Sequence, residues 1–196
     1  MYPLFESIRV EDGKVHLLEY HQARLEQSFL KLFNRKCSWN LKNILPDIPK
    51  TGLHKLRFLY NENSFSFETE PYRNQEIKSL KFIEIEDYTY DLKFTDRSFL
   101  SKVFAQRENC DDVLMTRKGY LTDTSYCNVI LFDGERWLTP EKPLFDGVQR
   151  QFLMDQKKIS PQQIHASELH NFQSFILVNA MRGFDKRFLQ SIKEIK

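Results

Sequence analysis

Long apolar runs are absent from this chain of 196 residues. No stretch reaches the roughly 18 consecutive apolar residues that a membrane-spanning helix needs. No apolar segment follows a basic start at the N-terminus, as it would in a signal peptide. We therefore expect no membrane segment, and we expect the protein to reside in the cytoplasm.

Closely spaced cysteines are absent as well. Cys37, Cys110 and Cys127 are an odd number and form no CxxC pair. The five histidines show no zinc-ligand spacing, and His165 and His170 are expected in ordinary surface or packing positions. We therefore expect neither a disulfide framework nor a structural zinc site, and we predict no metal ligands.

A large charge imbalance is also missing, because the formal net charge is only +2. Nothing in this balance directs the chain toward nucleic acid or a membrane surface. A composition of 41% hydrophobic and 29% charged residues is typical of a globular protein with a buried core. With no internal repeat and no low-complexity segment, the chain can form one domain or two small ones.

The N-terminal half has the pattern of two hairpins and a helix. Asp12-Gly13 separates two apolar runs, and this dipeptide suits the positive φ angles of a tight hairpin turn. A helix is expected where Leu25, Phe29 and Phe33 recur at helical spacing. The predicted elements are strands at Leu4–Val10 and Val15–Leu18, a helix at Tyr20–Phe33, and strands at Leu53–Tyr60, Phe65–Glu70 and Leu80–Ile85.

The C-terminal half has a different pattern, with more strands and turns at Lys118-Gly119 and Asp133-Gly134. A polar and aromatic segment without a clear period, Asp87–Leu92, is the expected linker between the halves. A short helix is possible after Asp185. The predicted elements are helices at Arg97–Arg107 and Val148–Lys157, and strands at Val113–Thr116, Tyr120–Asp123, Asn128–Phe132, Arg136–Leu138 and Phe175–Asn179.

Four short segments together carry the chemistry of one site. They offer a guanidinium, an amine, a carboxylate and a group of backbone amides. These groups suit an aromatic aldehyde phosphate with a protonated ring nitrogen, which describes pyridoxal 5′-phosphate (PLP). The segments are His21-Gln-Ala-Arg24-Leu25, Leu92-Lys93-Phe-Thr-Asp-Arg97, Asp123-Thr-Ser-Tyr-Cys-Asn128 and Gly147-Val-Gln-Arg150.

The order and the residues of these segments resemble those of the class IV PLP-dependent enzymes. That family includes branched-chain and D-amino-acid aminotransferases and 4-amino-4-deoxychorismate lyase, and the sequence of the segments is most similar to the lyase. The resemblance runs from about Leu4 to Gly183. The passages that carry it are Phe5–Val10 with Asp12–Val15, His21-x-x-Arg24-Leu25, Leu92-Lys93-x-x-Asp-Arg97 and Gly147–Phe152.

The resemblance implies an α+β, two-lobed fold like that of D-amino-acid aminotransferase, with PLP between the lobes and a homodimeric assembly. We expect a small N-terminal α+β domain at 1–86, a linker at 87–92, and a larger α/β domain at 93–196 that carries the catalytic lysine. Relatives usually begin with another strand and a Gly-Asp-Gly-like turn, so a form shortened at the N-terminus is expected.

Lys93 is the predicted catalytic residue. A free lysine has a pKa near ~10.4 and is a poor nucleophile at neutral pH, but burial and a nearby cation would lower that pKa. In the resembled family the amine links covalently to PLP and, once released by substrate, moves the Cα proton. The alternative is an ordinary surface lysine; the flanking Leu92, Asp96 and Arg97 favour the catalytic interpretation.

Asp123 is the predicted partner of the pyridine nitrogen. A carboxylate there keeps the ring protonated, so that the ring can accept electrons. Relatives usually have Glu at this position, five residues before Asn128, and Asp is one methylene shorter. The alternative is a structural Asx turn around Asp123. Asn128 is expected to brace the Asp123 loop.

The phosphate of the cofactor is assigned by resemblance to Arg24, whose planar guanidinium can make paired, charge-assisted hydrogen bonds. Backbone N–H groups of Val148 and Gln149, at the start of a predicted helix, would add further donors. The alternatives are a solvated arginine and a plain helix start. Asn179 and Ala180 resemble the last cofactor-facing turn of the family.

Three functions remain open at this point. The first is a lyase of folate biosynthesis that releases pyruvate and 4-aminobenzoate. The second is an aminotransferase of a small D- or L-amino acid, and the third is a catalytically silent binding protein, which Lys93 and Asp123 disfavour. Ser98 replaces the tyrosine that branched-chain aminotransferases carry five residues after the lysine. The substrate carboxylates could meet any of Arg9, Arg57, Arg97 and Arg107.

Overall fold

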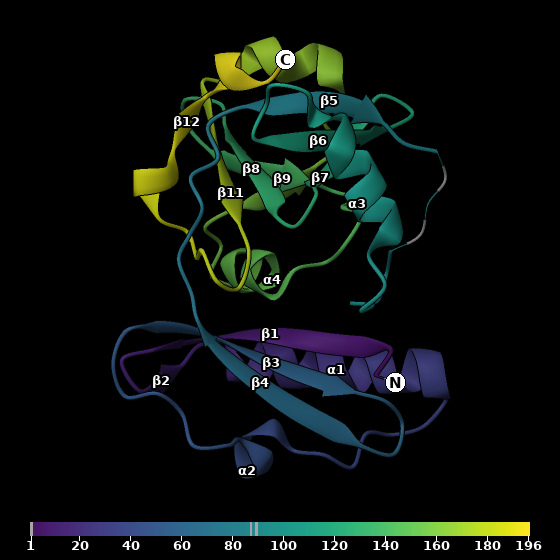
Figure 1. Ribbon diagram of the computed structural model, residues 1–196. Helices are drawn as coiled ribbons and strands as arrows, with labels where there is room; N and C mark the ends of the chain where they lie inside the picture. Colours follow the sequence, from purple (N-terminus) through teal and green to yellow (C-terminus); the bar gives the residue numbers. More distant parts are fainter. Residues whose placement is uncertain (1, 87, 89) are drawn as a thin grey trace. The chain divides into compact units, whose positions relative to one another are not determined.

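The structure is a computed structural model that describes residues 2–86, 88 and 90–196. It divides into two units (Figure 1): unit 1 comprises Met1–Asn74 with Leu92–Asp96, and unit 2 comprises Gln75–Asp91 with Arg97–Lys196. This division differs from the predicted boundaries at 86 and 93, because the chain leaves unit 1 earlier and returns to it once. Of the predicted linker 87–92, residues 87 and 89 lie outside the described residues.

Unit 1 is built on a four-stranded antiparallel sheet in the order β2-β1-β3-β4. Asp12 and Gly13 both have positive φ, as the Asp-Gly turn between the first two strands requires. The strands are β1 (Leu4–Glu11), β2 (Lys14–Val15), β3 (Leu53–Tyr60) and β4 (Phe65–Pro71), and the helices are α1 (Leu18–Phe33) and α2 (Leu41–Ile44).

The core of unit 1 lies on one face of this sheet. Side chains alternate across a strand, so Leu4, Ile8 and Val10 of β1 share a face. They pack with Leu25 and Phe29 of α1 in one buried cluster. The predicted helix is therefore confirmed, but β2 is shorter than the predicted strand at Val15–Leu18. Leu17 has a φ of 53°, and this left-handed residue ends the hairpin and starts α1.

Unit 2 contains an eight-stranded mixed sheet in the order β10-β9-β8-β7-β6-β5, with β11 paired to β8 and β12. Most of its predicted elements are confirmed, with shifted ends. The strands are β5 (Leu80–Glu84), β6 (Asp112–Arg117), β7 (Tyr120–Thr124), β8 (Asn128–Phe132), β9 (Trp137–Pro140), β10 (Ser160–Gln162), β11 (Ser174–Val178) and β12 (Gln190–Ser191), and the α-helices are α3 (Ser98–Phe104) and α4 (Val148–Asp155).

Short 3-10 turns complete unit 2, and the last two replace the C-terminal helix considered for the region after Asp185. They are η1 (Ala105–Arg107), η2 (Ala166–Asn171), η3 (Lys186–Phe188) and η4 (Ile192–Glu194). Within the described part of the chain, no helix is both long enough and apolar enough to cross a membrane.

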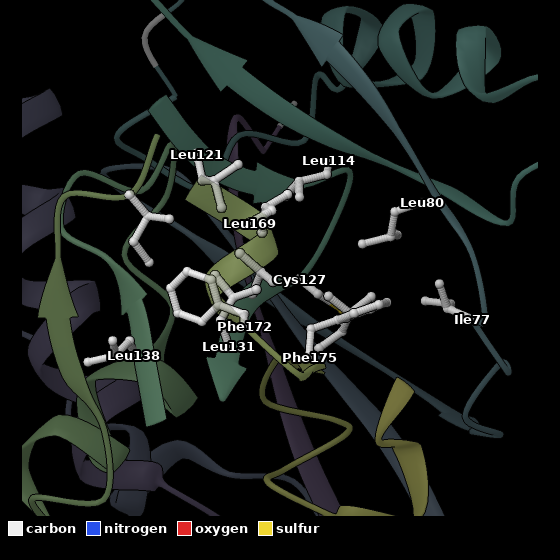
Figure 2. Close-up of a cluster of buried hydrophobic side chains, with 13 residues drawn as sticks. Ile77, Leu80, Leu114, Leu121, Cys127, Leu131, Leu138, Leu169, Phe172 and Phe175 are labelled. Atoms are coloured by element: carbon white, nitrogen blue, oxygen red, sulfur yellow. The ribbon is translucent and has the colours of Figure 1, made fainter. Parts of the chain in front are cut away.

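Buried side chains from the sheet and from η2 form the largest core cluster of unit 2 (Figure 2). Leu80 of β5 belongs to this cluster, and β5 pairs in parallel with β6. These contacts explain why the strand at 80–84, predicted to belong to the N-terminal domain, belongs to unit 2.

Candidate active site

Lys93 lies in a short segment that is bonded to β1 of unit 1. Its carbonyl oxygen accepts from the backbone N–H of Phe5 at 3.0 Å. Phe94 forms a bridge with Leu4, and the Thr95 N–H donates to the Pro3 carbonyl at 2.8 Å. This segment therefore behaves as a short extra edge of the unit 1 sheet, which fixes the backbone on which the Lys93 side chain is carried.

Two cationic groups lie close to the ring of Phe5. Lys93 Nζ is 4.9 Å from the ring centroid, and the guanidinium carbon of Arg57 is 5.2 Å from it. Arg57 pairs opposite Ser7 in the register of β1 and β3, so it shares the strand face of Phe5. The face of the sheet opposite the α1 core thus carries the lysine and an arginine around one aromatic ring.

Arg24 does not project into solvent, because its side chain is only 13% exposed. Its Nε donates to Oε1 of Glu6 at 2.9 Å, and its Nη2 makes a second short contact with Oε2. His21 Nδ1 lies 2.6 Å from the same Oε2. The alternative of a solvated helix-face arginine is therefore wrong, since Arg24 belongs to a partly buried cluster with Glu6 and His21.

The charges of this cluster determine its protonation. Burial alone would raise the pKa of the Glu6 carboxyl, but the Arg24 charge and the His21 contact lower it to about 2. Burial lowers the pKa of His21, against the contact with Glu6, and the charges of Arg24 and Lys93 lower it further. Glu6 is therefore an anion and His21 a neutral ring at neutral pH.

Asp123, at the end of β7 in unit 2, is buried. One carboxylate oxygen accepts from Asn128 Nδ2 at 2.7 Å, and the other accepts from the Phe145 backbone N–H at 2.7 Å. Burial raises the pKa of Asp123 to about 7, although the Phe145 and Asn128 donors and the Arg150 charge lower it. Asn128 and Phe145 lie 5 and 22 residues from Asp123, farther along the chain than the partners of an Asx turn, so the turn interpretation is wrong.

Asn128 braces the Asp123 carboxylate, as predicted, and also donates to the Phe145 carbonyl at 2.8 Å. A Cβ atom on Gly147 would lie 2.2 Å from Asn128 Oδ1, so a larger residue here would displace the Asn128 amide that braces Asp123. Gly147 is the N-cap of α4, whose first turn contains Val148 and Gln149. The two motifs that the sequence placed in one site are thus in contact within unit 2.

Asn179 also reaches the loop between β7 and β8. Its Nδ2 lies 3.2 Å from Cys127 Sγ, while its Oδ1 accepts from the N–H groups of Met181 and Arg182 at 2.9 Å each. The turn that contains Asn179 and the half-buried Ala180 therefore lies beside the loop that follows Asp123. Its predicted contact with a cofactor stays a prediction.

The four candidate arginines for substrate carboxylates separate into two groups. Arg97 donates to the Ser125 carbonyl at 2.6 Å, and Arg107 donates to the Phe104 carbonyl at 3.3 Å, both within unit 2. Arg9 and Arg57 lie on the Phe5 face of the unit 1 sheet, where they pair with Glu11 at 2.6 Å and Glu68 at 2.7 Å. Arg57 also contacts the ring that Lys93 contacts.

The residues present fit the chemistry of PLP within each unit. A carboxylate has about four lone-pair sites, so Asp123 can accept a further donor such as a pyridinium N–H besides its protein donors. The first N–H groups of a helix have no partner within the helix, which suits a phosphate at the start of α4. In unit 1, the Lys93 amine is half-buried against an aromatic ring.

No role in the site was predicted for Glu6, His21 or Phe145, although Glu6 and His21 lie in the motifs that carry the resemblance. Glu6 lies in the same alternation as Leu4, Ile8 and Val10, so the strand pattern alone could have predicted that its side chain lies on the core face of β1. His21 and Arg24 are three residues apart and share a helix face. The Phe145 contact gave no comparable signal, because a backbone N–H can donate from any residue.

Comparisons with known proteins agree with this description. The chain matches the family model of class IV amino-transferases over residues 3–185. An uncharacterized protein of Haemophilus influenzae (strain Rd) is 33% identical over 187 residues, which cover 93% of this chain and 100% of that protein. A candidate 4-amino-4-deoxychorismate lyase from Haemophilus somnus 129PT has a solved structure with a TM-score of 0.89. It is 34% identical, with 94% of this chain and 98% of that chain covered.

A hypothetical aminotransferase from Mycobacterium tuberculosis, solved in a PLP-bound form, shares the fold at 19% identity and a TM-score of 0.76, with 93% of this chain and 78% of that chain covered. The predicted class IV fold is confirmed by these similarities. PLP is the cofactor of the family, so the predicted cofactor is confirmed at the family level. The chain belongs to the class IV aminotransferase family of PLP-dependent enzymes.

Proposed function

We propose that this chain is a PLP-dependent lyase that converts 4-amino-4-deoxychorismate to 4-aminobenzoate and pyruvate. The observation that carries the PLP-dependent part of the proposal is the buried Asp123 carboxyl, whose hydrogen-bond donors Asn128 and Phe145 are both neutral. The similarity to the candidate lyase from H. somnus supports this substrate over an amino acid. The replacement of the transaminase tyrosine by Ser98 supports it further.

When bound, PLP supplies an aromatic ring that accepts electrons from the carbon bearing the substrate amine. Lys93 takes the proton from that carbon, and the C–O bond that joins the enolpyruvyl group to the neighbouring ring carbon breaks. The enolpyruvyl oxygen leaves with the electron pair of the C–O bond, and a proton delivered to its methylene carbon gives pyruvate. The electron pair of the broken C–H bond forms the new double bond that makes the substrate ring aromatic, so the reaction needs neither an oxidant nor a keto acid. Asp123 keeps a proton at the pyridine nitrogen.

The remaining predicted residues hold the cofactor in this proposal. Arg24 and the backbone N–H groups of Val148 and Gln149 bind its phosphate, while Asn179 and Ala180 form a cofactor-facing turn. We assign Arg57 to a substrate carboxylate, because it contacts the same Phe5 ring as Lys93. We also propose a homodimer, which sedimentation of the purified protein would test.

The covalent role of Lys93 is tested by borohydride reduction of the protein with PLP. We expect one pyridoxyl-peptide, containing Lys93, on mass-spectrometric mapping. Lys93→Arg keeps the charge but should abolish the label. A label on another lysine would contradict the role of Lys93, and no label with added PLP would contradict PLP-dependent activity of this type.

The reaction type is tested by supplying 4-amino-4-deoxychorismate alone. A lyase needs no second substrate, so we expect many turnovers of 4-aminobenzoate per protein chain without a keto acid. An aminotransferase would stop with its cofactor in the amine form until a keto acid arrives. Absence of 4-aminobenzoate, together with rapid amino exchange between D- or L-alanine and 2-oxoglutarate, would establish the aminotransferase instead.

A further inference from the structure

We infer that Glu6, together with His21, is a positioning residue that orients the Arg24 guanidinium for a phosphate group. This inference rests on the proposed function, because it assumes that Arg24 binds the phosphate of PLP. It adds a reason why the site would select the phosphorylated cofactor over pyridoxal. All three residues lie in unit 1, on β1 and α1.

The contact between Glu6 and Arg24 is bidentate. Glu6 Oε1 accepts from Arg24 Nε at 2.9 Å, and Oε2 accepts from Nη2. A guanidinium carries five N–H donors in a planar fork, and two parallel bonds along one edge fix both its position and its plane. The Glu6 side chain is itself 0% exposed, so a rigid core holds the carboxylate.

His21 restrains the same carboxylate from a second direction. Its Nδ1 is 2.6 Å from Glu6 Oε2, and it precedes Arg24 by one helical turn on α1. Among the described residues, its buried Nε2 has no hydrogen-bond partner. A neutral ring with the proton on Nδ1 donates to Glu6 and buries only a lone pair at Nε2, whereas a charged ring would bury an unpaired N–H.

This arrangement would recognise a phosphate through the orientation of the Arg24 guanidinium and not through a net positive charge. The Glu6 carboxylate balances the charge of Arg24, so the cluster does not attract anions through an excess of positive charge. Its contribution is an arginine fork whose orientation is set before the ligand arrives, which reduces the ordering cost of binding. An oriented fork recognises a phosphate and is indifferent to pyridoxal, which has a hydroxyl in that place.

The test is to measure the dissociation constants of PLP and pyridoxal by absorbance titration of the wild-type protein and of Glu6→Gln. We expect Glu6→Gln to weaken PLP by about tenfold or more, as for a lost charge-assisted hydrogen bond, and to leave pyridoxal affinity nearly unchanged. Glu26→Gln is the matched control. This variant removes the same charge from α1, but Glu26 is exposed and accepts a hydrogen bond from Gln22 Nε2 at 2.7 Å at the surface.

A double-variant cycle separates positioning from general structure. If Glu6 acts through Arg24, Glu6→Gln should cause no further loss of PLP affinity in the Arg24→Gln background. Should Glu6→Gln fail to fold, His21 provides the test. His21→Asn keeps a donor near the Nδ1 position and should retain the preference for PLP, whereas His21→Leu should lower it.

The outcomes distinguish this inference from the proposed function. Equal losses of PLP and pyridoxal affinity in Glu6→Gln, or additive losses in the double variant, would overturn the positioning role alone. A wild-type protein that binds neither compound would overturn the proposed function. A preference for PLP that survives in both Glu6→Gln and His21→Leu would also reject the inference.

Discussion

Glu6 of unit 1 and Asp123 of unit 2 are both buried carboxyl groups, and the directions of their pKa shifts are opposite. The pKa of Glu6 is lowered to about 2, and that of Asp123 is raised to about 7. Burial alone would raise both. Glu6 is bonded directly to an arginine, whereas Asp123 accepts from a neutral amide side chain and a backbone N–H.

This difference shows that the charge of the nearest donors, and not the extent of burial, separates the two groups. A carboxylate paired with a guanidinium keeps its negative charge at all ordinary pH values, which suits a fixed structural anion. A carboxyl that titrates near neutrality can exchange a proton with a ring nitrogen. Divergent pKa values of this kind are how two acids in one protein take different roles.

Removing the Glu6 charge should have the largest effect on stability. Glu6→Gln leaves Arg24 partly buried without its anion, and such a change costs about 3–5 kcal/mol of unfolding free energy. Because the folded pKa is depressed below 4.5, the stabilisation from Glu6 is present above pH 4.5 and is lost as the pH falls through about 2. Urea unfolding measures both effects, and an unchanged unfolding free energy would contradict the pairing.

Asp123 should have the opposite dependence on pH. Its folded pKa of about 7 exceeds the ordinary 3.8, so its stabilisation is complete below pH 3.8 and is lost as the pH rises through 7. Between those values the cofactor-free wild type should lose roughly 4 kcal/mol of unfolding free energy relative to Asp123→Asn. Parallel pH profiles of unfolding free energy for the two proteins would show that Asp123 is not shifted.

Turnover should depend on the acid at position 123. Asp123→Asn should retain some PLP but lower turnover by about 100-fold, since a charge-stabilising contact of the reaction is lost. Asp123→Glu should be tolerated, because relatives of the family usually carry Glu there. Full activity of Asp123→Asn in the 4-aminobenzoate assay would leave this residue a structural role only.

Arg57 should have the smallest of these effects. Arg57→Gln removes the proposed carboxylate contact, and we expect KM to rise by about tenfold with little change in kcat. Arg35→Gln is the control, because Arg35 is 62% exposed and its pair with Glu62 lies at the surface of unit 1. An unchanged KM for Arg57→Gln would show that Arg57 does not bind the substrate carboxylate, and the other three candidate arginines would then be tested in the same way.

Local sequence patterns predicted the secondary structure correctly where apolar residues recur at a regular spacing or where a turn dipeptide is present. The Asp12-Gly13 hairpin and α1 agree with the prediction because turn chemistry and apolar spacing act within a few residues. Strand β10 (Ser160–Gln162) was not predicted. Its three residues, Ser160, Pro161 and Gln162, are all exposed, and the strand forms because its backbone pairs in parallel with β9. Such a strand has no side-chain period that a sequence could reveal.

Domain boundaries depended on pairing as well. The segment at 92–96 begins at the last residue of the expected linker, 87–92, but its backbone hydrogen bonds to Phe5 and Pro3 attach it to unit 1. The strand at 80–84 precedes that linker and pairs with β6 of unit 2. Composition along the chain places a single boundary. It cannot reveal that the chain enters unit 2, returns to unit 1 for one short segment, and then enters unit 2 again.

The sequence by itself determined the family, the cofactor and the order of the motifs, because these depend on residue types at short spacings. Only the tertiary structure decided the surroundings of each acid. Glu6 meets Arg24 across 18 positions, and Asp123 meets the Phe145 backbone across 22. Since a carboxyl's pKa depends on the charges within a few ångströms, packing between distant elements made one a permanent anion and the other a group that titrates near neutrality.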